Sequence, residues 1–183
     1  MSGLETYMRS RAWRHLSLSA FDPAPALRVL DGLDLHDRQE VHMGFGIDLT
    51  PGQLLRGLLS QELTGGHLAI AWHHAREGGA APFAIVGVAP GAAAGSGVAS
   101  LIARDHLQWR PAIRRLVIAL RDDLPGWMLS NGFRRIEARC WTKHPTAAEL
   151  LRSMGFVFET EIHGFGVTSS PWAQFALVPE RGH

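Results

Sequence analysis

Hydrophobic positions in the first third of the chain follow a strand pattern and then helical ones. Residues 16–20 alternate between apolar and polar side chains, which predicts a strand with one buried face. Apolar residues then recur at spacings of three and four, and Pro follows both Asp22 and Thr50. We therefore expect three short helices that begin near residues 23, 35 and 51. The third has capping-box spacing, Thr50 to Gln53.

Strand patterns dominate the middle of the chain. Residues 67–72, 83–89 and 98–103 are rich in apolar and β-branched side chains, and the connections between them are short. We expect an antiparallel meander. A long helix follows, because apolar residues recur with helical spacing from Ile113 to Met128. Pro125 should kink or break this helix, because proline lacks the N–H that the helix needs.

The last part of the chain predicts a strand over residues 135–141, a short helix, and strands over 156–162 and 172–178. The helix has a second capping-box pattern, Thr146 to Glu149. No internal repeat and no long polar linker divides the sequence. We therefore predict one domain over residues 13–179, with a polar leader at 1–12 and a short tail at 180–183.

Charge and cysteine content narrow the possible partners. The 183 residues include 18 Lys+Arg and 17 Asp+Glu, so the formal net charge is only +1. Nucleic-acid binding driven by clustered cations is therefore not expected. Cys140 is the single cysteine, which excludes an intramolecular disulfide and favours a reducing cytoplasm. Residues 78–103 carry no charge, but prolines and a run of small residues divide them into two β segments, so no membrane span is predicted.

The order of these elements resembles the GNAT family of acyl-CoA-dependent N-acetyltransferases. Ile136–Cys140 and Ala147–Glu159, the latter with a Gly-Phe turn, are similar to the fifth strand, fourth helix and sixth strand of that family. Asp37–Val41 and Gly87–Pro90 resemble most the phage internal-virion-protein-A-like branch. The resemblance covers roughly Trp13–Pro179. It implies an α/β (α+β) fold with a mixed, mostly antiparallel sheet of about seven strands flanked by helices.

The resemblance also implies where CoA would be held. Active family members carry a glycine-containing turn after the fourth strand, and its backbone N–H groups hold the pyrophosphate, because a Cβ would obstruct close approach. The matching segment here is Arg104–Trp109. Only Arg104 fits, whereas Leu107 and Trp109 stand at the glycine positions and Asp105 adds a negative charge. Arg104 is the one candidate cofactor residue, and the expectation is that no cofactor binds.

Candidate catalytic residues are few. Many active relatives use a tyrosine as general acid, but the only tyrosine here, Tyr7, lies in the leader. Asp105 and His106 are candidates for a base at the end of a strand, or they are helix-cap and loop residues. Cys140, four residues before His144, is either a nucleophile or a core residue. The histidines lack the spacing of a metal site, so no metal is expected.

Arginines follow one face of the long helix. Arg110, Arg114, Arg115 and Arg121 form a cationic stripe, with Asp122 and Asp123 beside it. Such a stripe is either a solvated helix surface or a contact surface for nucleic acid or an acidic partner.

Three functions are consistent with these observations. The first is a phage-encoded, non-catalytic GNAT-fold protein of the virion or of virion assembly, located in the virion or the host cytoplasm. Its expected partners are other virion or phage proteins, or further copies of itself. The alternative is an N-acetyltransferase that transfers an acetyl group from acetyl-CoA to an amine of a protein or small molecule. The third is an inactive acyl-CoA-binding sensor.

Overall fold

The computed structural model describes residues 15–167 and 169–179. The predicted leader with Tyr7, and the predicted tail, lie outside the described residues. In chain order the elements are β1 (Leu16–Ala20), α2 (Pro23–Asp31), α3 (Leu35–Phe45), α4 (Pro51–Leu63), β2 (His67–His74), β3 (Ala80–Pro90), β4 (Ser96–Ala103), α5 (Arg110–Ser130), β5 (Arg135–Trp141), α6 (Ala147–Ser153), β6 (Val157–Ile162) and β7 (Trp172–Leu177).

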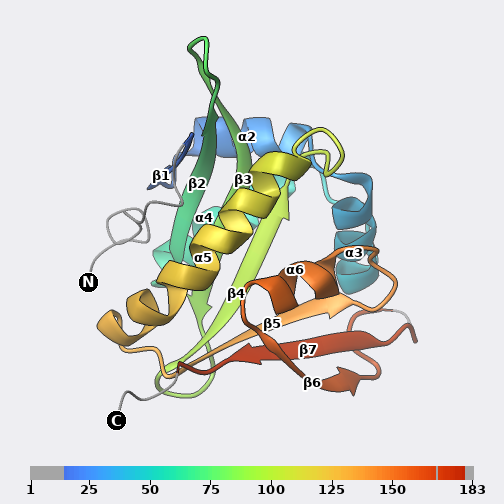
Figure 1. The fold of residues 1–183 in the computed structure, drawn as a ribbon. Coiled ribbons are helices and arrows are strands. Elements are labelled where there is room, and N and C mark those ends of the chain that lie inside the picture. Colours follow the sequence, from blue (N-terminus) through green and yellow to red (C-terminus); the bar gives the residue numbers. More distant parts are fainter. Residues whose placement is uncertain (1–14, 168, 180–183) are drawn as a thin grey trace.

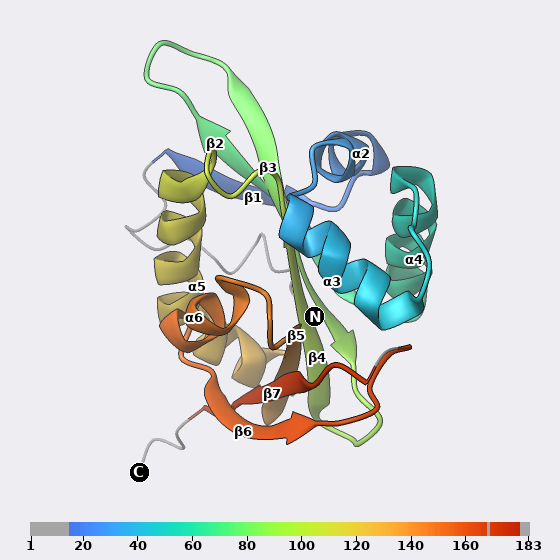
Figure 2. The same cartoon turned by 90° about the vertical axis from the view of Figure 1, so that its right-hand side faces the viewer.

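The strands form one mixed sheet of seven strands in the order β1-β2-β3-β4-β5-β7-β6. Every neighbouring pair is antiparallel except β4 and β5, which are parallel. Figure 2 shows α5 and α6 on one side of the sheet and α2, α3 and α4 on the other. The predicted α/β fold with a mostly antiparallel sheet is therefore confirmed. The uncharged segment 78–103 forms most of the β3–β4 hairpin, and no described helix is long and apolar enough to cross a membrane.

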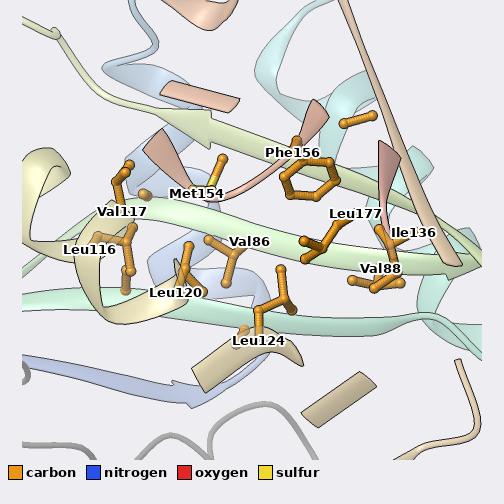
Figure 3. Packing of buried hydrophobic residues seen from close by; sticks show 14 of the residues in the cluster. Val86, Val88, Leu116, Val117, Leu120, Leu124, Ile136, Met154, Phe156 and Leu177 are labelled. Atoms are coloured by element: carbon orange, nitrogen blue, oxygen red, sulfur yellow. The ribbon is translucent and has the colours of Figure 1, made fainter. Parts of the chain in front are cut away.

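The helices on the two sides bury separate hydrophobic cores against the sheet. The larger core joins α5 and α6 to the strands, and Figure 3 shows its side chains from β3, α5, β5 and β7 pointing toward one another. The smaller core joins α2 and α4 to β2 and β3. Burial of one Leu-sized side chain stabilises the fold by about 1.5–3 kcal/mol, so these two layers hold the sheet in place.

The two predicted capping boxes had different outcomes. At the start of α4, the Thr50 side chain accepts from the Gln53 N–H and the Gln53 side chain accepts from the Thr50 N–H, so this box is confirmed. At the start of α6 no side-chain cap forms, and the box from Thr146 to Glu149 is wrong. The N–H groups of Thr146 and Ala147 donate instead to His144 Nδ1, over 3.3 and 3.0 Å. The imidazole has taken the place of the expected cap.

Of the kink or break predicted at Pro125, the break does not occur, because α5 continues as one helix from Arg110 to Ser130. Leu124, Trp127 and Met128 are all buried on both sides of the proline. Their packing against the sheet outweighs the single backbone hydrogen bond that proline removes.

Strands β4 and β5 separate along their length. They pair over only three positions, Ser96–Val98 with Arg135–Glu137, at the start of both strands. Beyond these positions β4 continues to Ala103 beside β3, and β5 continues to Trp141 beside β7. Figure 1 shows the two arrows diverging from their common starting point. The sheet is therefore split toward the carboxyl ends of its two central strands.

Candidate active site

A pocket of about 220 Å³ occupies the split between β4 and β5. Its interior is apolar, with side chains from β3, α5 and the turn after α6: Val86, Val88, Leu120, Leu124, Met154 and Phe156. Figure 3 shows these six side chains gathered in one region. A pocket of this size exceeds a cavity of about 150 Å³ that holds a benzene ring. The split therefore has room for a slender apolar chain.

Polar side chains also line the pocket, including Ser100 on β4 and Arg139 on β5, and four others from three segments form what we call its polar rim. Asp37 and Glu40 come from α3, His106 from the β4–α5 connection and His144 from the β5–α6 connection. Residues three apart lie on the same side of a helix, so α3 presents both carboxylates to the sheet. The Asp37 carboxylate accepts from the Ala103 N–H over 3.1 Å, and Glu40 accepts from the Trp141 N–H over 3.1 Å. The two carboxylates thus bond the backbone at the ends of the diverging strands.

The hydrogen bonds of His144 define its tautomer. Its Nδ1 accepts from two backbone N–H groups, those of Thr146 and Ala147, and so carries no proton when the ring is neutral. Its Nε2 then carries the proton and donates to Asp37 Oδ1 over 3.0 Å. His144 is only 6% exposed, so this carboxylate–imidazole bond lies away from solvent. The contact fixes the β5–α6 connection to α3.

The second imidazole, His106, lies between two carboxylates. Its Nε2 is 3.4 Å from Asp37 Oδ1 and its Nδ1 is 3.9 Å from Asp34 Oδ1. Burial alone would lower the pKa of His106, but the adjacent Asp37 carboxylate raises it above the ordinary value. Burial would likewise raise the pKa of Asp37, but the contacts with His106 and His144 lower it. Asp37 is therefore ionised at neutral pH, and His106 holds a proton more tightly than a free histidine.

Glu40 titrates near neutral pH. Burial is the main cause and raises the pKa of Glu40 to about 7, and the negative charge of Asp37 acts in the same direction. The hydrogen bond from Trp141 opposes this shift without cancelling it. A carboxylate with a pKa near the operating pH can take up and release a proton readily. Glu40 is therefore the residue of the polar rim best suited to act as a general base.

The atoms of Asp37, His106 and His144 lie within 4.8 Å of one another, which is close enough for a shared metal ion. The tautomer of His144 does not fit such a site. A metal would need the lone pair of Nε2, whereas the two N–H donors at Nδ1 leave the proton on Nε2. The cluster is therefore a hydrogen-bonded carboxylate–imidazole network and not a metal ligand set.

The connection from β4 to α5 places its backbone N–H groups against carboxylates of the protein itself. The N–H groups of Leu107 and Gln108 donate to Asp105 Oδ1 over 2.9 and 3.0 Å. The N–H of His106 donates to Asp34 Oδ2 over 2.9 Å. These are the groups that would have to bind the pyrophosphate of CoA at this turn, so the turn as it stands does not fit that part of the cofactor.

The side chains of Arg104, Leu107 and Trp109, which the sequence placed at the cofactor turn, all lie outside the pocket. Arg104 donates to the Pro82 carbonyl over 3.3 Å and lies over the Trp109 ring, and it is not among the residues that line the pocket. Trp109 stacks on Phe83, with ring centroids 5.7 Å apart, and Leu107 is 86% exposed. Neither Leu107 nor Trp109 therefore fills the split between β4 and β5.

Of the catalytic candidates, His106 lines the pocket, whereas Asp105 caps the turn. Cys140 also lines the pocket, and burial, together with the negative charge of Glu40, raises the pKa of its thiol to about 12. Cys140 is therefore a neutral thiol at physiological pH, which suits a core residue. The sequence patterns did not identify Asp37 and Glu40 as site residues, because the backbone groups that they bond lie 66 and 101 residues further along the chain.

No protein-family model and no curated protein matches the chain. Solved structures do match it. An acetyltransferase of the GNAT family from Bacillus anthracis superposes with a TM-score of 0.68 and 10% identity, covering 92% of this chain and 97% of the other. The acetyl transferase from Salmonella typhimurium that modifies the N-terminal serine of ribosomal protein L7/L12 has a TM-score of 0.67 and 10% identity, covering 92% and 98%.

A third match includes bound ligands. Spermidine N-acetyltransferase from Vibrio cholerae, in complex with CoA and spermine, has a TM-score of 0.60 and 13% identity, covering 90% of this chain and 96% of the other. These matches give no support to the phage branch or a virion role, which stay predictions. They span nearly the whole chain at low identity, and together with the split sheet they show that this protein has the GNAT acetyltransferase fold.

Proposed function

We propose that the protein is an N-acyltransferase that transfers an acyl group from a thioester to an amine, with acetyl-CoA as the first donor to test. One observation supports this above all others. Glu40, a carboxylate with a pKa of about 7, lies at the polar rim of an apolar pocket in the split between β4 and β5. The pocket can take the acyl thioester arm, and the carboxylate can take a proton from the amine.

The reaction that this arrangement suits has a simple proton balance. An amine that arrives as an ammonium ion transfers one proton to the Glu40 carboxylate. Its nitrogen then attacks the thioester carbonyl carbon, so that the new C–N bond forms and the C–S bond breaks. The nitrogen loses a second proton, and the departing thiolate gains one, so the products are an amide and a thiol. The Trp141 N–H holds the Glu40 side chain at the rim during these transfers.

Substitution of Glu40 by glutamine tests the role of the base. Glu40→Gln keeps an oxygen that can accept from the Trp141 N–H but cannot take a proton, so we expect kcat/KM for acyl transfer to fall by about 100-fold or more. Wild-type kcat/KM should rise with pH through about 7, because only the ionised carboxylate is active. Glu62→Gln, an exposed change on α4, is the matched control and should leave activity unchanged.

The two possible failures of this test have different meanings. Glu40→Gln with activity within about threefold of wild type would remove Glu40 from the mechanism. A wild-type protein with no acyl transfer to any of a panel of amines, including polyamines and peptide N-termini, would remove the proposed function itself.

A non-catalytic binding protein is the second candidate, and the turn before α5 favours it. There the N–H groups of His106, Leu107 and Gln108 already bond carboxylates of the protein. The virion role, the phage partners and the self-association expected from the sequence belong to this second candidate. Acyl transfer by the wild-type protein would exclude it.

A further inference from the structure

We propose that the acyl donor is recognised through its pantetheine arm and acyl group, and not through a pyrophosphate bound at the β4–α5 turn. The ligand chemistry is therefore a pantetheine thioester, free or attached to a carrier. This inference rests on the proposed function, because it concerns the donor for the same pocket.

Competition for backbone donors is the first reason. Three consecutive N–H groups, those of residues 106–108, donate to Asp34 and Asp105 over 2.9 to 3.0 Å. A pyrophosphate could take these donors only after both carboxylates had moved. Asp34 also accepts from the His36 N–H, so its displacement would free the start of α3 as well. The turn is thus already satisfied by groups with the same charge as a phosphate.

Electrostatics is the second reason. Asp34, Asp37 and Asp105 all lie next to the turn, and the His106 ring contacts Asp34 over 3.9 Å and Asp37 over 3.4 Å. A diphosphate would add negative charge to this acidic surrounding and would be repelled. Arg104, the one arginine of the turn, is bonded to the Pro82 carbonyl and stacked on Trp109, so it is not positioned to compensate.

The pocket, by contrast, needs no charge from the donor. Its interior is apolar, and its rim contains hydrogen-bonding groups that suit the amides of a pantetheine arm. Two sources can supply such an arm. One is acyl-CoA whose nucleotide stays in solvent, and the other is the prosthetic arm of an acidic carrier protein. The exposed arginines at the start of α5, Arg110 and Arg114, would contact the acidic surface of such a carrier.

Binding without turnover provides the decisive test. We expect calorimetry to give dissociation constants for CoA and for pantetheine within about threefold of each other. Asp105→Gly frees the N–H groups of Leu107 and Gln108 and removes a negative charge, so CoA should bind about tenfold more tightly while pantetheine is unchanged. Asp31→Gly, at the exposed end of α2, is the control and should change neither constant. Amide hydrogen exchange at residues 107 and 108 should stay the same when CoA binds the wild type.

Two results would overturn the inference. The first is wild-type binding of CoA more than about 30-fold tighter than binding of pantetheine, with protection of the amides at 107 and 108. The second is the absence of binding by either compound. These outcomes are separate from those of the Glu40 experiment: equal binding with no acyl transfer would contradict the proposed function alone, whereas tight pyrophosphate-dependent binding with transfer would contradict this inference alone.

A comparison of donors identifies the source of the arm. An acetylated carrier protein with kcat/KM about tenfold above that of acetyl-CoA would identify a carrier, and Arg114→Glu should then reduce that advantage without affecting acetyl-pantetheine. Equal kcat/KM values for all three donors would identify the free thioester. A kcat/KM for acetyl-CoA that is far higher than the values for the other two donors would contradict the inference.

Discussion

Two regions at the carboxyl end of β4 differ sharply in how they suit an acyl donor. On one side, the split from β5 leaves an apolar pocket with a polar rim of Asp37, Glu40, His106 and His144. On the other side, the turn that leads into α5 bonds its own N–H groups to Asp34 and Asp105. The pocket exists because the backbones of β4 and β5 diverge after three paired positions. The turn depends on the identity of a few side chains, so it can change while the fold stays the same.

The same type of residue has opposite roles in the two regions. In the polar rim, Asp37 and Glu40 bond the backbone of two separate strands and lie close enough to influence each other's charge. In the turn, Asp105 is exposed and caps its own local segment. Buried carboxylates in a shared network change pKa and stability, whereas an exposed cap contributes mainly a local hydrogen bond. Substitutions at four positions test this difference, and exposed residues outside both regions serve as controls for two of them.

The largest effect is expected at Asp37. Asp37→Asn leaves the buried donor of His144 and the nearby His106 without a carboxylate, so the free energy of unfolding should fall by about 3 kcal/mol at pH 7. The pKa of Asp37 is lowered in the folded protein, so this contribution exists above the unfolded value of 3.8 and is lost as the pH falls through the folded value. Urea denaturation at pH 7 and at pH 3 measures both quantities.

Asp48 provides the matched control for this substitution. It also contacts a histidine, His42, over 2.9 Å, but its side chain is 94% exposed. Asp48→Asn should therefore leave stability within about 0.5 kcal/mol of wild type. Equal losses for Asp37→Asn and Asp48→Asn would mean that the polar rim is no more than a set of surface contacts.

Filling the pocket should remove donor binding without changing the turn. Ala99 on β4 lines the pocket, and Ala99→Phe places a ring in the space that a pantetheine arm would need. We expect pantetheine to bind about 100-fold more weakly, as measured by calorimetry, with circular dichroism confirming a folded protein. Ala92→Phe, in the exposed β3–β4 loop, is the control. Unchanged binding to the Ala99 variant would place the donor elsewhere.

We expect the ionised Glu40 carboxylate to lower the free energy of unfolding, although the same carboxylate supports activity. Its folded pKa of about 7 lies above the unfolded value of 4.5, so the folded state binds more protons between these values and its stability falls as the pH rises. Glu40→Gln should therefore raise the free energy of unfolding by about 1–3 kcal/mol at pH 8 and have no such effect below pH of about 4.5. Denaturation curves at both pH values check this. A loss of stability at pH 8 would show that the carboxylate is structural.

The smallest effect is expected at the turn. Asp105→Ala removes the acceptor for the Leu107 and Gln108 N–H groups, so it should lower the free energy of unfolding by about 1 kcal/mol. Asp105→Ser keeps an acceptor oxygen, so it should lower the free energy of unfolding by only a few tenths of a kcal/mol. Thermal unfolding of the two variants measures the difference. A loss as large as that of Asp37→Asn would mean that the two regions do not differ as proposed.

Much of the fold could be predicted from local patterns. The strand over residues 16–20 and the Thr50–Gln53 cap each follow from a few adjacent residues. At two places a contact from elsewhere outweighed the local pattern. At the start of α6 the backbone N–H of Ala147 donates to His144 and not to a capping side chain. Helix α5 continues past Pro125, because the residues on both sides of the proline pack in the core.

The candidate site could be predicted only in part. The sequence drew attention to Arg104, Asp105 and His106, which are adjacent in the chain, but only His106 lines the pocket. Asp37 and Glu40 were not recognised, because their partners lie far along the sequence: the Ala103 N–H is 66 residues from Asp37 and the Trp141 N–H is 101 residues from Glu40. Sequence spacing carries no signal for contacts over such separations.

The sequence by itself determined the order of the elements and the absence of glycines at the turn before α5. These follow from side-chain periodicity and from the steric requirements of single residues. Only the tertiary structure decided that the split between β4 and β5 is open, that α3 supplies the carboxylates of its polar rim, and that Glu40 titrates near neutral pH. Those properties depend on burial and on the charges of distant neighbours, which exist only once the chain has folded.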